Sequence, residues 1–90
     1  MHAIVTSSTI HDYEQARKTL QEEGIPRISQ APGFVGAYFA RVGENGGRGM
    51  IVFESEEAAQ ALAEQLKTNP PGGEAITIER IEVGEVTGRA

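Results

Sequence analysis

Few side chains in this sequence could carry acid–base or nucleophilic chemistry. Cysteine is absent, which excludes a thiolate nucleophile, a thiolate-bound metal and a disulfide. The groups able to transfer a proton or stabilise an oxyanion include two tyrosines, two histidines and an arginine: Tyr13, Tyr38, His2, His11 and Arg41. Two histidines without a cluster of further ligands do not make a metal site, so the sequence predicts none.

Each of these residues also has a structural interpretation. Tyr38 falls on a predicted strand, where the ring would belong to the core and the hydroxyl would reach an edge. Tyr13 could pack its ring under the first predicted helix, and His11 lies near the start of that helix, where the helix dipole disfavours an imidazolium. Arg41 could pair with Glu44 or with acids of a partner subunit. Both interpretations stay open for every one of them.

The composition is typical of one globular domain spanning residues 1–90, with 39% hydrophobic and 23% charged residues. The 13 acidic and 8 basic side chains give a net charge of −5. An acidic chain repels phosphate backbones and anionic lipid surfaces, so we expect neither nucleic acid nor a membrane as a partner. The N-terminus lacks a secretory-signal pattern, and we expect a cytoplasmic protein.

The start of the chain predicts a strand followed by a helix. β-Branched residues favour a strand over residues 2–6, which the polar run at 6–9 is expected to end. Thr9 is the expected helix N-cap, because the acidic Asp12 stands three residues after it.

Apolar residues at helical spacing continue this helix over residues 13–20. Gly24 is expected to end it in the left-handed conformation that glycine accepts. Pro26 favours a further short turn, because proline suits the first positions of a helix.

The middle of the chain predicts a β-hairpin. Phe34–Val42 is the strongest strand signal, and residues 48–54 form the returning strand. Asn45 and Gly46 between them are typical of a tight hairpin turn.

A helix and a last strand complete the pattern. Ser55 is the expected N-cap of a helix that ends near Lys67. Residues 75–86 form an extended segment, whose apolar alternation shifts phase between Ile78 and Ile81 and so predicts a bulge.

The element order β-α-β-β-α-β predicts an α+β, ferredoxin-like domain in which two helices cover one face of a four-stranded antiparallel sheet. The hairpin strands are apolar on both faces. On one side we place Val35, Ala37, Phe39, Ile51 and Phe53; on the other, Phe34, Gly36, Tyr38, Ala40, Val42, Met50 and Val52. An uncovered apolar face favours a homodimer packed sheet to sheet.

Two segments, 32–41 (PGFVGAYFAR) and 51–59 (IVFESEEAA), resemble the dimeric α/β-barrel superfamily, which includes antibiotic-biosynthesis monooxygenase-type domains. Length and element order match as well, so the resemblance covers most of the chain. It implies a homodimer whose two sheets together form an α/β barrel. Each subunit would have a ligand cleft between its sheet and its helices.

Small members of this superfamily include cofactor-independent monooxygenases of aromatic phenols, which use neither flavin nor metal. The resemblance therefore implies a small aromatic or apolar ligand and no cofactor. It implies a catalytic set drawn from Tyr38, His11, Tyr13 and Arg41. The expected apolar walls are Phe34, Phe39 and Phe53. The sequence lacks tryptophan, which such sites often use.

Other functions on this fold fit less well. Haem-degrading relatives need a histidine on the second helix, and residues 56–67 contain none. The glycine-rich segment 43–49 joins two strands and lacks the lysine that ends a phosphate-binding loop. RNA-recognition modules need basic and aromatic residues on the third strand, and residues 48–53 contain one aromatic residue in an acidic chain. Metal chaperones of this fold need paired cysteines, and the sequence has no cysteine.

The remaining alternative is a dimer that binds a metabolite or another protein without catalysing a reaction. A cleft of at least about 300 Å³ lined by two of the named polar residues would favour an enzyme; a closed interface would favour the alternative. Ala58, Ala59 and Ala63 on the second helix are compatible with either, because small residues allow close packing or leave space.

Overall fold

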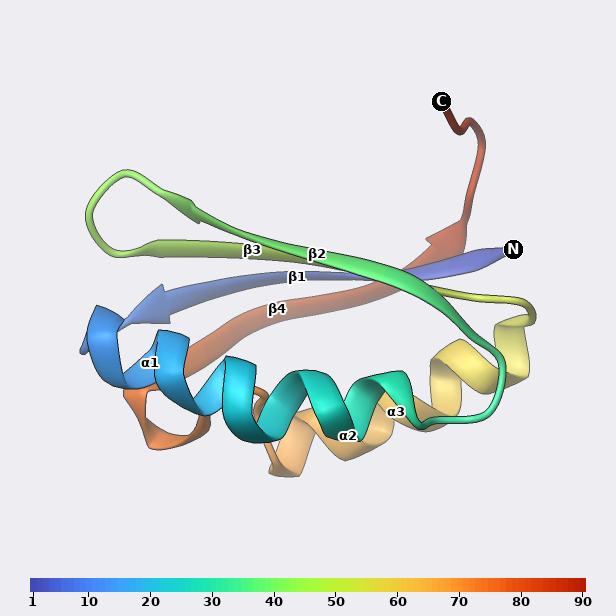
Figure 1. The fold of residues 1–90 in the computed structure, drawn as a ribbon. Coiled ribbons are helices and arrows are strands. Elements are labelled where there is room, and N and C mark those ends of the chain that lie inside the picture. Colours follow the sequence, from blue (N-terminus) through green and yellow to red (C-terminus); the bar gives the residue numbers. More distant parts are fainter.

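The computed structural model describes residues 1–90 and shows the predicted order of elements (Figure 1). The strands are β1 (His2–Ile10), β2 (Phe34–Val42), β3 (Gly46–Phe53) and β4 (Ile76–Glu85). The helices are α1 (Tyr13–Thr19), which continues through a π-helical turn at Leu20–Gly24 into α2 (Ile25–Ser29), and α3 (Glu56–Thr68). A 3-10 turn at Gly73–Ala75 precedes β4.

The strands form one antiparallel sheet in the order β2-β3-β1-β4, and the helices all lie on one face of it (Figure 1). This arrangement is the predicted ferredoxin-like α+β fold. The opposite face, here called the open face, carries no helix. None of the helices combines the length and apolar character needed to cross a membrane.

The core lies between the sheet and the helices. Its largest fully buried side chains are Phe53, Ile4, Ile28, Ile51 and Leu66. They come from β3, β1, α2 and α3, so the core joins the helices to the two central strands. Burying one such side chain stabilises the fold by about 1.5–3 kcal/mol.

The first strand is longer than predicted, and the expected end at residues 6–9 is wrong. β1 pairs with β3 on one side as far as Thr9 and with β4 on the other as far as Ile10. These two ladders satisfy the backbone polar groups whatever the side chains, so a run of hydroxyl residues does not interrupt the strand. The helix N-cap is Asp12, not Thr9: its carboxylate accepts a hydrogen bond from the Gln15 backbone N–H at 3.1 Å.

The prediction that Gly24 ends the first helix is also wrong. Gly24 has a helical φ of −66°, and the chain continues into α2, with Pro26 in its first turn as expected. Glycine is needed there for space, because a Cβ at this position would lie 2.5 Å from the carbonyl oxygen of Pro71.

The sheet face assigned to Phe34 is wrong, and the turn of the hairpin has a different conformation from the one predicted. A bulge at the start of β2 places Phe34 opposite Phe53, on the helix-covered face, where the two rings pack edge to face with centroids 6.1 Å apart. Val35 is left 41% exposed. The turn obtains its positive φ from Gly43, at 66°, and not from the predicted Asn45 and Gly46 pair.

Two other local predictions are confirmed. The Ser55 hydroxyl accepts a hydrogen bond from the Ala58 backbone N–H at 3.2 Å and so caps α3. The register of β1 with β4 shifts between Ser7 and Ser8, which brings Ile78 and Ile81 onto the same face as predicted.

The steric role of Gly24 can be tested with Gly24→Ala. We expect the variant to lower the free energy of unfolding by about 1–3 kcal/mol, as overpacking does, measured by urea denaturation. If glycine were present only for backbone freedom, alanine would instead raise stability by up to about 1 kcal/mol. Gly88→Ala is the control, because a Cβ there meets no atom within 4 Å.

Candidate functional site

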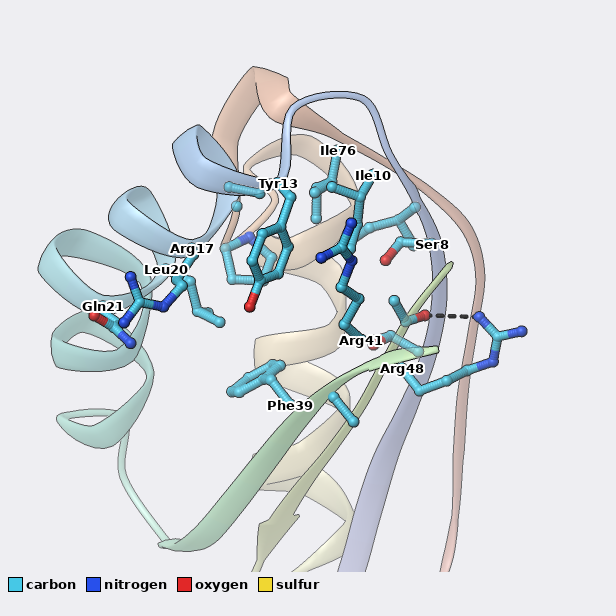
Figure 2. A pocket seen from close by; sticks show the side chains of 17 residues that line it. Ser8, Ile10, Tyr13, Arg17, Leu20, Gln21, Phe39, Arg41, Arg48 and Ile76 are labelled. Atoms are coloured by element: carbon cyan, nitrogen blue, oxygen red, sulfur yellow. Dashed lines mark hydrogen bonds between the residues drawn. The ribbon is translucent and has the colours of Figure 1, made fainter. Parts of the chain in front are cut away.

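A pocket of about 200 Å³ opens between the helix-covered face of the sheet and α1 (Figure 2). All four strands, α1 and the loop before β4 contribute to its lining. The residues that matter most below are Thr6, Ser8, Tyr13, Phe39, Arg41 and Gly47.

The strand register explains why the pocket forms at this end of the sheet. In one row across the central strands, Ile4 lies beside Ile51, and both side chains fill the core beneath the helices. In the next two rows on the same face, β3 contributes only glycines and β1 contributes short hydroxyl side chains. The centre of the sheet therefore presents small residues just where α1 passes over it.

Any larger residue at these glycine positions would place its Cβ in space that neighbouring side chains already occupy. A Cβ at Gly47 would lie 2.6 Å from Ser8 Oγ, and one at Gly49 would lie 2.7 Å from Thr6 Oγ1 and 2.9 Å from Phe39 Cδ1. Neighbouring side chains thus pack directly against the glycines, and Gly47 itself forms part of the pocket lining.

Tyr13 and Arg41 meet at this pocket. Tyr13 is the first residue of α1, and Arg41 lies near the end of β2. The guanidinium carbon of Arg41 stands 4.0 Å from the centre of the Tyr13 ring, a cation–π contact. Arg41 Nε also donates a hydrogen bond to the Glu44 carbonyl at 3.0 Å. Figure 2 shows the hydroxyl end of Tyr13 directed into the pocket, between Arg41 and Phe39.

The charged residues of the lining are all basic. They are Arg17, Arg41 and Arg48, with no aspartate, glutamate or histidine among them, although the chain carries a net charge of −5. None of the three takes part in the ion pairs of the structure. The guanidinium of Arg48 points away from the pocket and donates to the Gly47 carbonyl, and that of Arg17 extends outward beside Gln21 (Figure 2), so Arg41 supplies the charge inside the pocket.

The structure brings together two of the four predicted catalytic residues. Tyr13 and Arg41 line the pocket, whereas Tyr38 and His11 do not. Tyr38 is 85% exposed on the open face. His11 is exposed and shares a hydrogen bond with Thr77 at 2.6 Å. A catalytic role for any of the four stays a prediction.

Of the three predicted aromatic walls, Phe39 lines the pocket, while Phe34 and Phe53 pack in the core farther along the sheet. The hydroxyl residues Thr6 and Ser8 were missed. The signal for them was the unbroken run of four hydroxyl residues, which we interpreted as the end of a strand.

The pocket meets only part of the criterion set from the sequence. Two named polar residues line it, but about 200 Å³ is below the roughly 300 Å³ at which pockets for drug-sized ligands begin. Its size suits a ligand of one or two rings. The alanines of α3 do not create it: Ala59 and Ala63 are buried in close contact with the core, and the space lies under α1.

No protein-family model matches the sequence, and no curated protein matches it. Solved structures do. SnoaB, a cofactor-independent oxygenase from Streptomyces nogalater, aligns with a TM-score of 0.68 at 14% identity, over 98% of this chain and 94% of that one. A dimeric ferredoxin-like protein from an uncultured marine organism aligns with a TM-score of 0.61 at 14% identity, covering 100% and 98%.

A monooxygenase from the gene ActVA-Orf6 of Streptomyces coelicolor, solved with the ligand nanaomycin D, aligns with a TM-score of 0.59 at 16% identity, over 99% of this chain and 89% of that one. The chain shares their fold. The expected likeness to monooxygenase-type ferredoxin-like domains is thereby confirmed at the level of architecture.

The role of Gly47 in keeping the pocket open predicts the effect of Gly47→Ala. The added methyl group would meet Ser8 Oγ and take up space in the pocket lining, and we expect binding of 2-naphthoate to weaken about tenfold, measured by its fluorescence. Gly88→Ala should bind like the wild type. Unchanged binding in Gly47→Ala would show that the ligand lies elsewhere.

Proposed function

We propose that the pocket under α1 binds a small aromatic ligand and that Tyr13 and Arg41 act on an oxygen of that ligand. The observation that carries the proposal is the juxtaposition of these two side chains, with the Arg41 guanidinium carbon 4.0 Å from the Tyr13 ring centre, in the lining of a pocket with apolar walls. Phe39, Ile76 and Ile78 offer surface for an aromatic ring, and a few convergent polar groups fix its orientation.

The reaction we propose is oxygenation of an electron-rich phenol without a cofactor. A ring CH₂ activated by the phenol becomes a carbonyl: one atom of O₂ enters the product, and the other leaves as water with the two hydrogens. The substrate supplies all four electrons. Arg41 would stabilise the phenolate oxygen, and the Tyr13 hydroxyl would exchange a proton with the reacting oxygens. The fold of SnoaB, described as a cofactor-independent oxygenase, supports this proposal.

A second candidate is ligand binding without catalysis. The residues of the lining favour this candidate. Apart from its serine, threonine and arginines, the lining contains one side chain able to exchange a proton, Tyr13. Carboxylates and imidazoles, the commonest catalytic bases, are missing from it. The two candidates share the same pocket and differ in whether O₂ is consumed.

Oxygen uptake with a panel of naphthols and hydroquinones, which have one or two rings, separates the two. For an oxygenase, we expect Tyr13→Phe and Arg41→Ala each to lower the rate about a hundredfold, because each removes a group that acts on the developing charge. Arg89→Ala removes the same charge from the C-terminal segment and should keep the rate of the wild type. Binding of panel members without uptake would favour the non-catalytic candidate.

We also propose that the protein works as a homodimer formed through the open face. This face exposes large apolar side chains from the three strands β1, β2 and β3: Val5 (41%), Met50 (47%), Val42 (51%) and Tyr38 (85%). Val5, Met50 and Tyr38 lie in one row across the sheet. The row ends at Glu82 on β4, so the apolar surface covers one side of the open face. A second copy would remove it from water, and one structural neighbour is described as dimeric.

Met50→Asp tests the dimer, because burying an unpaired carboxylate at the centre of an interface costs several kcal/mol. We expect the variant to sediment as a monomer at micromolar concentration where the wild type sediments as a dimer. Ile25→Asp is the matched control: Ile25 on α2 is 40% exposed and lies away from the open face. A monomeric wild type would rule out this assembly.

A further inference from the structure

We infer that the pocket selects a ligand that is already an anion in solution, and that the free end of the Arg41 guanidinium pairs with its oxygens. The ligand class is a one- or two-ring aromatic acid, such as an aromatic carboxylate. This inference rests on the pocket proposed above as the ligand site, but not on the oxygenation proposed there.

The first observation is the hydrogen bonding of Arg41. Its Nε donates to the Glu44 carbonyl, whereas neither terminal nitrogen makes a hydrogen bond within the protein. No carboxylate lies within ion-pair distance of it. Arg27 and Arg48 instead donate through a terminal nitrogen to backbone carbonyls, and Arg17, the other lining arginine, extends outward beside Gln21 (Figure 2). Arg41 thus keeps the planar pair of donors that matches a carboxylate.

The second observation is the position of that free end. The cation–π contact with Tyr13 and the bond to Glu44 hold the guanidinium from two directions at the pocket. Figure 2 shows it within the group of lining side chains, next to Tyr13 and Ile10, rather than extended away from them as Arg48 is. A guanidinium that is held in place loses less conformational freedom when it binds a ligand.

The third observation is the charge around the pocket. A ligand anion there meets no acidic side chain of the lining, and Arg41 is the lining arginine whose guanidinium stays among the pocket side chains (Figure 2). The acidic residues that give the chain its net charge of −5 lie elsewhere. Like-charge repulsion, which would reject an anion from most of this surface, is therefore weaker at the pocket.

The fourth observation concerns the proton. The lining contains no carboxylate and no imidazole that could take a proton from a neutral, weakly acidic ligand. A ligand that ionises by itself in water needs no such base. Positive charge without a base fits a preformed anion, an aromatic carboxylate or a phenol acidic enough to ionise in water, better than a phenol that binds with its proton.

Direct binding of two isosteric probes, 2-naphthoate and 2-naphthamide, tests the inference by calorimetry at pH 7.5 and low salt. The rings are the same, and only the charge of the substituent differs. We expect 2-naphthoate to bind about tenfold or more tightly than 2-naphthamide, and added salt to reduce this preference.

Three variants assign the preference. In Arg41→Ala, the ratio of the affinity for 2-naphthoate to that for 2-naphthamide should fall close to one. In Arg41→Lys, which keeps the charge but loses the paired donors, this ratio should fall only in part. Arg89→Ala removes one positive charge outside the pocket and should bind both probes like the wild type.

The outcomes separate this inference from the proposed function. Equal binding of the two probes, or a preference that survives in Arg41→Ala, would overturn the selection of an anion by Arg41 and leave the pocket as a ligand site. Failure of both probes to bind would overturn the pocket itself, and this inference with it. Binding of 2-naphthoate without any oxygen uptake from the panel would support the anion site and count against oxygenation.

Discussion

The pairing of β1 with both of its neighbours is the constraint on which the rest of the structure depends. Because β1 runs through the centre of the sheet, its register with β3 decides which residues stand side by side beneath the helices. Where isoleucines meet, the core is filled; where the glycines of β3 meet the hydroxyl residues of β1, space remains. A packed core and a pocket therefore result from one ladder of hydrogen bonds.

The two helical segments use the sheet differently. α3 buries Leu62 and Leu66 together with alanines and packs closely on the central strands. α1 buries little besides Ala16 and contributes Tyr13 to the pocket. Between α1 and α2, the π-helical turn lets Gly24 press against the loop at Pro71, which is itself part of the lining. Beyond the pocket, the helical segment is therefore held by this close contact and by the buried side chain of Ile28 on α2.

Charge and apolar surface are also divided between the two faces. The helix side carries a pocket whose charged lining residues are arginines, in an acidic chain. The open face carries an apolar area on β1, β2 and β3, bordered by Arg80 and Glu82 on β4. One sheet can thus present a ligand site and a subunit interface that do not compete, because alternate residues of each strand serve opposite faces.

The sequence by itself determined the order of the elements, the strand Phe34–Val42, the Ser55 cap and the bulge near Ile78, because each depends on neighbours a few residues away. It also supplied Tyr13 and Arg41 as candidates. Only the tertiary structure decided that these two meet while Tyr38 faces the other side, that Phe34 turns into the core, and that Gly24 serves a contact with Pro71. Those features depend on strand register, on a bulge and on contacts between distant segments, and a one-residue shift in register moves a side chain to the opposite face.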